Sequence, residues 1–255
     1  MSYFESTPDA HPDYREEKRQ RIASFAGDAE FRALSNAWRA MALERKYMND
    51  FSWLGRPLIQ LPTDAMALQE ILWAVQPDLV IETGVAHGGS LVLSASLLEL
   101  IGRGEVLGID IDIRPHNRRA IEAHPLGRRI SLIEGSSIAP EVVAQVHARA
   151  AGKERVLVCL DSNHTHDHVL AELSAYAGLV SPGSYCIVFD TFVEDMPDDH
   201  VWTGRPWGKG NNPKTAVHAW LGTHPEFEID RSIEDRLLVT SAPDGFLRRK
   251  ERGGA

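Results

Sequence analysis

Acidic side chains stand at the ends of five short apolar segments that the sequence predicts as β-strands. They are Glu82, Asp110, Glu134, Asp161 and Asp190. A single acidic residue in such a place is explained by a cap on the following helix. Five of them at one edge of a parallel sheet point instead to a ligand, because such sheets bind ligands beyond the carboxyl ends of their strands. The expected ligand is cationic, rich in hydroxyl groups or held through a metal ion.

The first of these segments leads into a glycine turn, VIETGVAHGGS, which runs from Val80 to Ser90. Its spacing matches neither the G-x-G-x-x-G turn of dinucleotide-binding proteins nor a phosphate-binding P-loop. Glu82 would repel a pyrophosphate at the start of the next helix, whereas it suits a sulfonium ligand that carries an ammonium group. Asp110 ends the second strand and is placed to accept hydrogen bonds from ribose hydroxyls. This arrangement predicts a site for S-adenosylmethionine.

The residues predicted to bind this cofactor lie at four of the strand ends. They are Glu82, Gly84, His87, Gly88, Ser90, Asp110, Asp112, Ser136, Ser137 and Asp161. Ser136 and Ser137 follow the third strand and would border the adenine. For His87 the sequence leaves open whether the side chain contacts the ligand or only fills the turn.

Asp161 and Asp190 end neighbouring strands, and two carboxylates are a sensible minimum for Mg²⁺, which usually keeps several waters. His164 stands three residues after Asp161 in the segment DSNHTHDH. An imidazole there can take a proton from a hydroxyl group, so His164 is predicted as the general base beside the catalytic Asp161. In one alternative, Asp161 and His164 bind a transition metal. In another, Asp161 caps a helix and Asp190 is a solvated loop residue. His166 and His168 are expected on a helix surface in the preferred interpretation.

A long segment rich in glycine and proline, from Asp195 to Lys214, is typical of a lid or a substrate wall. Trp202 and Trp207 suit stacking on a sugar ring, and Lys209 is predicted to contact the substrate with them. The alternative is an insertion whose tryptophans pack only on each other.

Strands and helices alternate through the middle of the chain, which predicts a doubly wound, mostly parallel α/β sheet. The strands are expected at 78–82, 105–111, 130–134, 156–161 and 185–190. Two more, within FEIDRS and RLLVTSAP, would form a hairpin, complete seven strands and make the last one antiparallel. Residues 13–49 have helical character, and Asp64 is a plausible cap of the helix that follows Pro62. The first dozen residues are expected to be disordered.

The composition argues against several classes of partner. A net charge of −9 disfavours nucleic acid and anionic membranes, which need a clustered basic surface. No apolar run approaches a membrane span, and no signal peptide is evident. Cys159 and Cys186 lie in apolar runs and are expected as buried free thiols, which favours a cytoplasmic location.

Several motifs together resemble one family. The segments SWLGRPLIQLP, ETGVAHGGS, GIDIDIRPHN, LDSNHTHDHV and GRPWGKGNNP are similar to the cephalosporin hydroxylase and rhamnosyl O-methyltransferase family, within the class I S-adenosylmethionine-dependent methyltransferases. The resemblance covers roughly residues 45–245. It implies a Rossmann-like methyltransferase domain at 60–247, a mostly helical N-terminal extension at 1–59 and a basic flexible tail at 248–255. It also implies a homo-oligomer.

The resemblance further implies a metal site with Asp161 and an acidic pair at the next strand end. That pair reads Phe189-Asp190 here, so Thr191 is included as a third metal residue. The expected activity is a Mg²⁺-dependent O-methyl transfer to a hydroxyl of a sugar or glycosylated natural product. The acceptor oxygen would lie on the metal and His164 would take its proton. The alternatives are a component of a hydroxylation step, with Asp161, His164 and His168 as iron ligands, a nicotinamide-dependent dehydrogenase, and a non-catalytic module that binds the cofactor.

Overall fold

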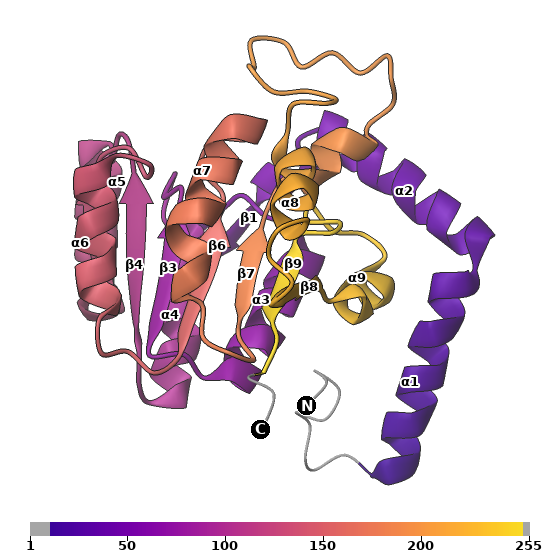
Figure 1. Cartoon of the computed structure of the whole chain (residues 1–255), viewed down its shortest axis with the longest axis horizontal. Coiled ribbons are helices and arrows are strands. Elements are labelled where there is room, and N and C mark those ends of the chain that lie inside the picture. Colours follow the sequence, from indigo (N-terminus) through magenta and orange to yellow (C-terminus); the bar gives the residue numbers. More distant parts are fainter. Residues whose placement is uncertain (1–10, 252–255) are drawn as a thin grey trace.

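The chain has 255 residues, and a computed structural model describes residues 11–251. Its centre is a seven-stranded sheet with the strand order β5-β4-β3-β6-β7-β9-β8 (Figure 1). The strands are β3 (Leu79–Thr83), β4 (Glu105–Asp110), β5 (Ile130–Glu134), β6 (Val156–Leu160), β7 (Tyr185–Val188), β8 (Phe227–Ile229) and β9 (Phe246–Arg249). The five strands β3 to β7 pair in parallel with their neighbours in this set. β9 is antiparallel to both of its neighbours, β7 and β8. The predicted doubly wound sheet with an antiparallel last strand is confirmed.

Helices cover both faces of the sheet. They are α3 (Pro62–Val75), α4 (Gly89–Ile101), α5 (Pro115–Glu122), α6 (Pro140–Ala150), α7 (His166–Tyr176), α8 (Pro213–Leu221) and α9 (Arg231–Leu237). Successive strand residues alternate between two apolar cores, since Val80 packs with α3 and α4 whereas Ile81 packs with α6, α7 and α8. No helix among residues 11–251 is long and apolar enough to cross a membrane.

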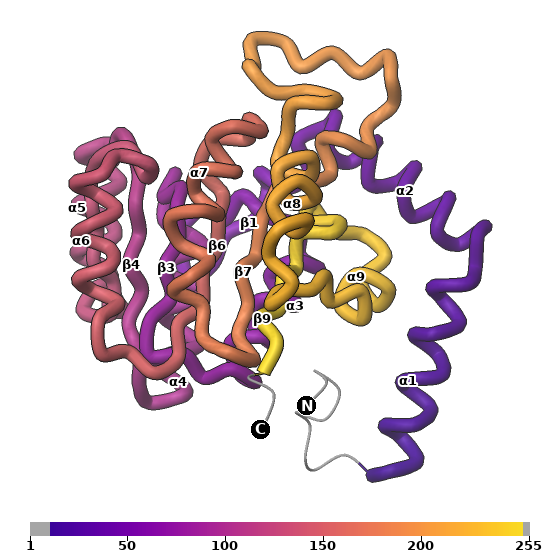
Figure 2. Tube along the Cα trace, viewed as in Figure 1, coloured from indigo at the N-terminus to yellow at the C-terminus, as the bar shows by residue number. Residues whose placement is uncertain are grey.

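Two helices precede the sheet, where the sequence predicts one continuous helical stretch. α1 (Pro12–Gly27) and α2 (Ala29–Glu44) are separated at Asp28, whose side chain accepts a hydrogen bond from the Phe31 amide and so begins α2. A short 3-10 helix, η2 (Tyr47–Asp50), follows. Figure 2 shows α1 standing apart from the sheet while α2 leads back to its upper edge. The disorder expected for the first dozen residues is wrong for His11 and Pro12, because His11 caps α1 and Pro12 begins it. For residues 1–10 the expectation lies outside the described residues.

A small hairpin that the sequence does not predict connects η2 to the sheet domain. β1 (Phe51–Trp53) and β2 (Arg56–Leu58) pair through a turn at Leu54 and Gly55, both of which have a positive φ. The hairpin packs on the start of α4, where a Cβ on Gly89 would overlap the carbonyl oxygen of Pro57. The chain before residue 60 is therefore part of the packing around the glycine turn.

The C-terminal part corrects three sequence predictions. RLLVTSAP is not a strand, because Asp230 caps α9 and that helix takes up the first two residues of the segment. Arg248 and Arg249 belong to β9 rather than to a flexible tail, and the Arg249 guanidinium donates to the carbonyls of Gly178 and Val180. Residues 252–255 lie outside the described range.

The third correction concerns Asp64, which was predicted to cap the helix after Pro62 and does not. It lies inside α3, 1% exposed, and accepts hydrogen bonds from the Thr240 hydroxyl and from both the amide and the hydroxyl of Ser241. Burial raises the pKa of Asp64 to about 6, and these hydrogen bonds oppose the rise. Asp64 thus fixes the loop that follows α9 against the start of α3.

Candidate functional site

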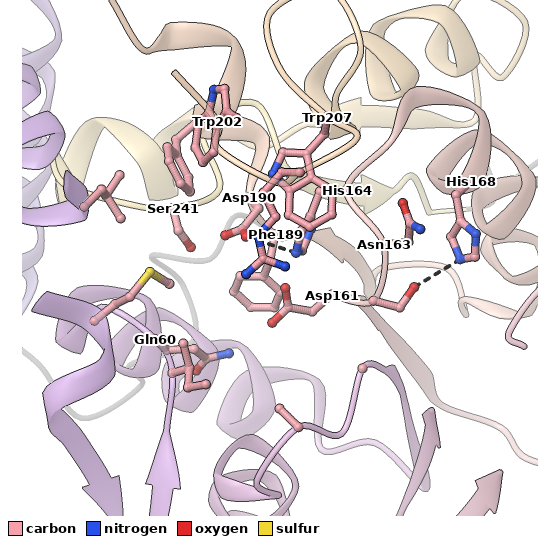
Figure 3. Close-up of a pocket in the computed structure, with 18 of the residues that line it drawn as sticks. Gln60, Asp161, Asn163, His164, His168, Phe189, Asp190, Trp202, Trp207 and Ser241 are labelled. Carbon is pink, nitrogen blue, oxygen red and sulfur yellow. Dashed lines mark hydrogen bonds and ion pairs between the residues drawn. The ribbon is translucent and has the colours of Figure 1, made fainter. Parts of the chain in front are cut away.

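A cavity of about 940 Å³ lies at the carboxyl ends of the parallel strands, as expected for this sheet (Figure 3). Of the five strand-end carboxylates, Asp110, Asp161 and Asp190 line it. Glu134 is exposed and pairs with Arg118 at 2.9 Å, and Glu82 is buried behind the glycine turn. Glu134 and Glu82 therefore do not line this cavity with the other three, and a cofactor contact by Glu82 stays a prediction.

The glycine turn is held close to the strand beside it. Gly84 has a φ of 92°, and a Cβ there would overlap the backbone carbonyl oxygen of Asp161. Gly88 has a φ of 81° and ends the turn at the start of α4, where a Cβ would meet the side chain of Ile121. Both positions need glycine, because the left-handed backbone and the close approach exclude a side chain.

Asp110 organises the turn as well as lining the cavity. Its Oδ2 accepts hydrogen bonds from the amides of Val85 at 2.8 Å and Ala86 at 3.2 Å, and its Oδ1 accepts one from Asp112 at 3.1 Å. Asp112 itself is exposed and does not line the cavity. A carboxylate oxygen has two lone pairs, so Asp110 can still accept hydrogen bonds from ribose hydroxyls.

The hairpin clamps the outer side of the same turn. Arg56 donates from Nε, at 2.9 Å, and from Nη2 to the carbonyl of His87, and its Nη2 also reaches Asn117 Oδ1 at 2.9 Å. Asn117 in turn donates to the carbonyl of Ala86 at 2.9 Å. The role that the structure gives His87 is its backbone carbonyl, since His87 is absent from the residues lining the cavity.

Glu82 and Ser90 are paired with each other instead of facing the cavity. The Ser90 hydroxyl donates to Glu82 Oε1, and Glu82 is 3% exposed. Burial raises the pKa of Glu82 to about 7, while the hydrogen bond from Ser90 opposes that rise. The two residues join the end of β3 to the first turn of α4 beneath the glycine turn.

Ser136 and Ser137 line the cavity on the β5 side, and a histidine that the sequence analysis places on a helix surface joins them. His168 lines the cavity, with its Nε2 3.1 Å from Ser137 Oγ and 3.2 Å from Ser162 Oγ. Ser162 donates to Glu172 Oε1 at 2.7 Å, and Glu172 is fully buried. The spacing of His168 and Glu172, four residues apart on one helix, is the signal that could have revealed this cluster.

Asp161, His164 and Asp190 form the one group among residues 11–251 that could hold a metal ion, with one ligand atom from each lying within 4.8 Å of the others. His164 Nε2 is 3.3 Å from Asp190 Oδ2 (Figure 3). Burial, followed by repulsion from Asp190, raises the pKa of Asp161 well above its usual range. Burial also raises the pKa of Asp190, while His164 and Arg205 oppose it. A bound cation would relieve this repulsion.

The prediction of Thr191 as a metal residue is wrong. Thr191 is fully buried, and its hydroxyl donates to the carbonyl of Pro243 at 2.6 Å. Phe189, which stands in place of the first acidic residue of the pair, is 3% exposed and packs into the core while touching the cavity. The acidic residues that could hold a metal ion here are therefore Asp161 and Asp190.

The segment between Asp195 and Lys214 covers the outer part of the cavity, and both of its tryptophans line it. Trp207 contacts the His164 ring edge-to-face, with centroids 4.7 Å apart, and Trp202 contacts His200 at 4.6 Å. Lys209 does not line the cavity; it is exposed and bonded to Asp198, and its contact with a substrate stays a prediction.

The sequence analysis missed the N-terminal residues that line the cavity. They lie between the end of α2 and η2, namely Leu43, Glu44, Lys46, Met48 and Asn49. From the covering segment, Arg205 lies 5.0 Å from the Trp207 ring and also lines the cavity. No motif marks these residues, since the fold alone brings the N-terminal helix to the substrate side.

Comparisons with known proteins agree with this geometry. The sequence model of the family described as "Rhamnosyl O-methyltransferase/CmcI" matches residues 45–250. A rhamnosyl O-methyltransferase of Mycobacterium bovis (strain BCG / Pasteur 1173P2) is 30% identical over 237 residues, which cover 89% of this chain and 91% of that protein.

Two solved structures share the fold. A CmcI structure described with Mg-SAM has a TM-score of 0.54 and 20% identity, over 79% of this chain and 77% of that one. A structure of MycE, a methyltransferase from the mycinamycin biosynthetic pathway in complex with Mg and SAH, has a TM-score of 0.50 and 18% identity, over 84% of this chain and 54% of that one. At these identities the likeness shows the Rossmann-like methyltransferase fold.

Proposed function

This chain belongs to the rhamnosyl O-methyltransferase/CmcI family, and from that membership we propose that it is a Mg²⁺-dependent methyltransferase that uses S-adenosylmethionine and acts on a hydroxyl of a sugar or glycosylated natural product. The observation that carries the proposal is one cavity with two chemically different parts. Asp110, Ser136 and Ser137 supply hydrogen-bonding groups at one side, and Asp161, His164 and Asp190 gather at the other.

The metal part fits a hard divalent cation. Two carboxylates from adjacent strand ends suit Mg²⁺, which accepts few protein ligands and keeps waters. Asp161 and Asp190 repel one another and burial raises the pKa of both, so a bound cation would stabilise their charged forms. Related or similar proteins are described with Mg and with S-adenosylmethionine or S-adenosylhomocysteine, which supports the same pair of cofactors here.

When bound, S-adenosylmethionine supplies a methyl group on a cationic sulfur, and Mg²⁺ lowers the pKa of a hydroxyl group beside it. Asp110, with Ser136 and Ser137, would hold the nucleoside through hydrogen bonds. His164 would take the hydroxyl proton, and Asp190, whose Oδ2 lies 3.3 Å from Nε2, would stabilise the imidazolium that forms. Trp207 packs edge-to-face against the His164 ring and so helps to orient it.

The outer part of the cavity suits an acceptor with an apolar, ring-containing surface. Trp202, Trp207 and Met48 line it together with the neutral amide of Asn49. Aromatic rings stack on the apolar faces of sugars and aglycones, and the acidic chain disfavours a polyanionic acceptor. We include a homo-oligomer and a cytoplasmic location in the proposal, as expected from the family resemblance and from the free, buried Cys159 and Cys186.

His164 has a second candidate role as a metal ligand, because one of its ring nitrogens belongs to the same group as the two carboxylates. The test is a methyl-transfer assay with rhamnosylated acceptors, on the wild type and on His164→Gln. A general base predicts a loss of about 10²–10⁴-fold in kcat with Mg²⁺ affinity retained. Loss of Mg²⁺ affinity in calorimetry would identify a ligand instead, and an active variant would remove His164 from the mechanism.

The hypothesis of a hydroxylation step is disfavoured by the positions of its expected iron ligands. It requires Asp161, His164 and His168 together, but His168 is bonded to Ser137 and Ser162 and is not part of the metal group found among the described residues. That group has one histidine and two carboxylates rather than the two histidines and one carboxylate of non-haem iron oxygenases. A non-catalytic module would bind S-adenosylhomocysteine yet show no transfer in the same assay.

A further inference from the structure

The two ends of the covering segment meet at one carboxylate. Asp195 ends the 3-10 helix η5 (Thr191–Asp195), and Lys214 stands 19 residues later in the first turn of α8. Lys214 Nζ donates to Asp195 Oδ1 at 2.7 Å. Next to Asp195, Glu194 Oε2 accepts a hydrogen bond from the Gly210 amide at 2.8 Å. The covering segment is therefore a loop with a closed neck, which Figure 1 shows in orange above α8.

A buried arginine of α2 binds the second oxygen of the same carboxylate. Arg39 is 6% exposed, and its Nη2 donates to Asp195 Oδ2 at 3.3 Å while its Nη1 donates to the carbonyl of Thr240 at 3.4 Å. A guanidinium stays protonated at neutral pH, so a buried one needs a counter-charge. Within residues 11–251, Asp195 is the one acid that forms an ion pair with Arg39. Asp195 thus joins α2 to the neck of the loop as well as closing that neck.

Apolar contacts carry this connection into the outer part of the cavity. A cluster of buried side chains in and directly after η5 packs against α2 and against the two tryptophans of the covering segment. Its members are Phe192, Val193 and Met196, with Ala40 and Leu43 of α2 and with Trp202 and Trp207. Leu43, Met196 and both tryptophans line the cavity, whereas Asp195 does not. Any influence of Asp195 on the cavity therefore acts through these side chains.

We propose that Asp195 is a positioning residue for acceptor binding, whose carboxylate holds Trp202 and Trp207 over the outer part of the cavity by joining both ends of the covering segment to α2. The inference deepens the proposed function and rests on it for the identity of the acceptor. Glu194 has a different role, because its contact with Gly210 lies within the loop and closes the neck. Loss of the charge of Asp195 should therefore release the covering segment from α2 and leave the cofactor side unchanged.

The first test measures backbone hydrogen exchange by mass spectrometry on the full chain without ligands. Asp195→Asn keeps the shape of the side chain and removes its charge. The amides at 198–212 should then exchange about tenfold faster or more, as expected for the loss of hydrogen bonds between charged groups. The amides of β3, at 79–83, should keep their wild-type rate, because the sheet does not depend on the neck of the loop.

Three further variants separate this contact from a general effect of charge. Asp199→Asn makes the same change at an exposed residue of the same segment, which belongs to no ion pair within the described part of the chain, and should leave the exchange at 198–212 unchanged. Asp195→Glu retains a carboxylate and should restore most of the protection. Arg39→Gln should raise the exchange rate by a factor similar to that of Asp195→Asn. The double variant should raise it no further, since both substitutions remove the same contact.

The second test asks whether the effect is confined to the acceptor. With 4-nitrophenyl α-L-rhamnoside as the acceptor, Asp195→Asn should raise KM for this compound about tenfold and change kcat much less, because the lost contact positions the acceptor and does not take part in the transfer. The Kd for S-adenosylhomocysteine, measured by calorimetry, should equal that of the wild type. Asp195→Glu should bring KM back toward the wild-type value.

Three results would overturn the inference while leaving the proposed function intact. Unchanged exchange at 198–212 in Asp195→Asn would show that the carboxylate does not hold the segment. Equally faster exchange in β3 would reduce Asp195 to a residue of general stability. A wild-type KM together with faster exchange would separate the segment from acceptor binding. If the wild type neither bound S-adenosylhomocysteine nor transferred a methyl group, the proposed function would fail, and with it the role in acceptor binding.

Discussion

Glu82 is a buried acid whose ionisation works against folding. Its pKa is raised from 4.5 to about 7, so the folded chain holds a proton that the unfolded chain releases between these values. The free energy of unfolding therefore falls as the pH rises through this window. The rise in pKa corresponds to about 3 kcal/mol once the pH exceeds 7.

Glu82→Gln should remove this part of the pH dependence. The amide is neutral at every pH and can still accept the hydrogen bond from Ser90. Urea unfolding at pH 5 and pH 8 should show a fall in stability that is smaller in the variant, by up to about 3 kcal/mol. Glu134→Gln, at an exposed strand end, is the matched control and should keep the wild-type difference. Equal pH dependence in wild type and Glu82→Gln would contradict the assignment.

The spacing of acidic residues and histidine along the chain was enough to predict which candidate metal residues lie together. It was not enough to predict the orientation of the residue next to them. Parallel strands bring Asp161 and Asp190 to one edge, and three residues of loop bring His164 beside them. Thr191 turns away because Asp190 has a left-handed φ of 57° and a 3-10 helix begins directly after it. No rule for non-glycine residues predicts that backbone conformation.

At the scale of elements, the packing of the hairpin β1–β2 on the start of α4 requires the two backbones to lie very close at Gly89. Gly89→Ala should destabilise the chain by about 1–3 kcal/mol, because the new Cβ would overlap the carbonyl oxygen of Pro57 and push the hairpin outward. Cofactor affinity should fall with it, since Arg56 on the hairpin holds the carbonyl of His87 in the glycine turn. Thermal unfolding and calorimetry with S-adenosylhomocysteine measure the two effects.

Gly178→Ala is the matched control for this substitution. A Cβ on Gly178 would have no atom within 4 Å, and its φ is not positive. Its stability should change by less than about 1 kcal/mol, and its cofactor affinity should not change. If Gly89→Ala behaved like Gly178→Ala, the hairpin would not be packed on α4 as described.

The elements that the sequence predicts well are those with strong periodicity. The five central strands and the helices between them follow from apolar runs that alternate with amphipathic stretches. The hairpin was missed because each of its strands has three residues and Pro57 and Gly55 obscure any alternation. RLLVTSAP was misassigned as a strand because its apolar residues have strand character. In the structure Asp230 caps α9, and that helix continues into the first two residues of the segment.

At the scale of the whole molecule, α2 carries an exposed apolar stripe. Phe31, Leu34, Trp38 and Met41 are 40%, 64%, 47% and 53% exposed and recur at helical spacing. Alanines at positions 33 and 37 are also exposed on this helix and would allow a close approach. Contiguous exposed apolar surface in a folded protein commonly marks an interface. We expect a second copy of the chain to cover this stripe.

The double substitution Leu34→Glu with Met41→Glu should abolish the assembly. Light scattering should give the monomer mass of 28.3 kDa for this variant and a multiple of it for the wild type. Leu100→Glu, at a residue 76% exposed on α4, is the control and should keep the wild-type mass. A wild type that is itself monomeric at micromolar concentration would exclude the interface.

The contact between Gly84 and the carbonyl of Asp161 has a consequence for the whole molecule. It joins the turn of the cofactor side to the strand end of the metal side without an intervening side chain. A shift of this contact on binding of one ligand therefore changes the binding affinity for the other. Thermodynamic linkage requires this change in affinity to be mutual. By whatever factor the cation changes the affinity for the cofactor, the cofactor changes the affinity for the cation. If the coupling is positive, each ligand raises the affinity for the other. The complex with both ligands bound would then form mainly when the cation and the cofactor are present together.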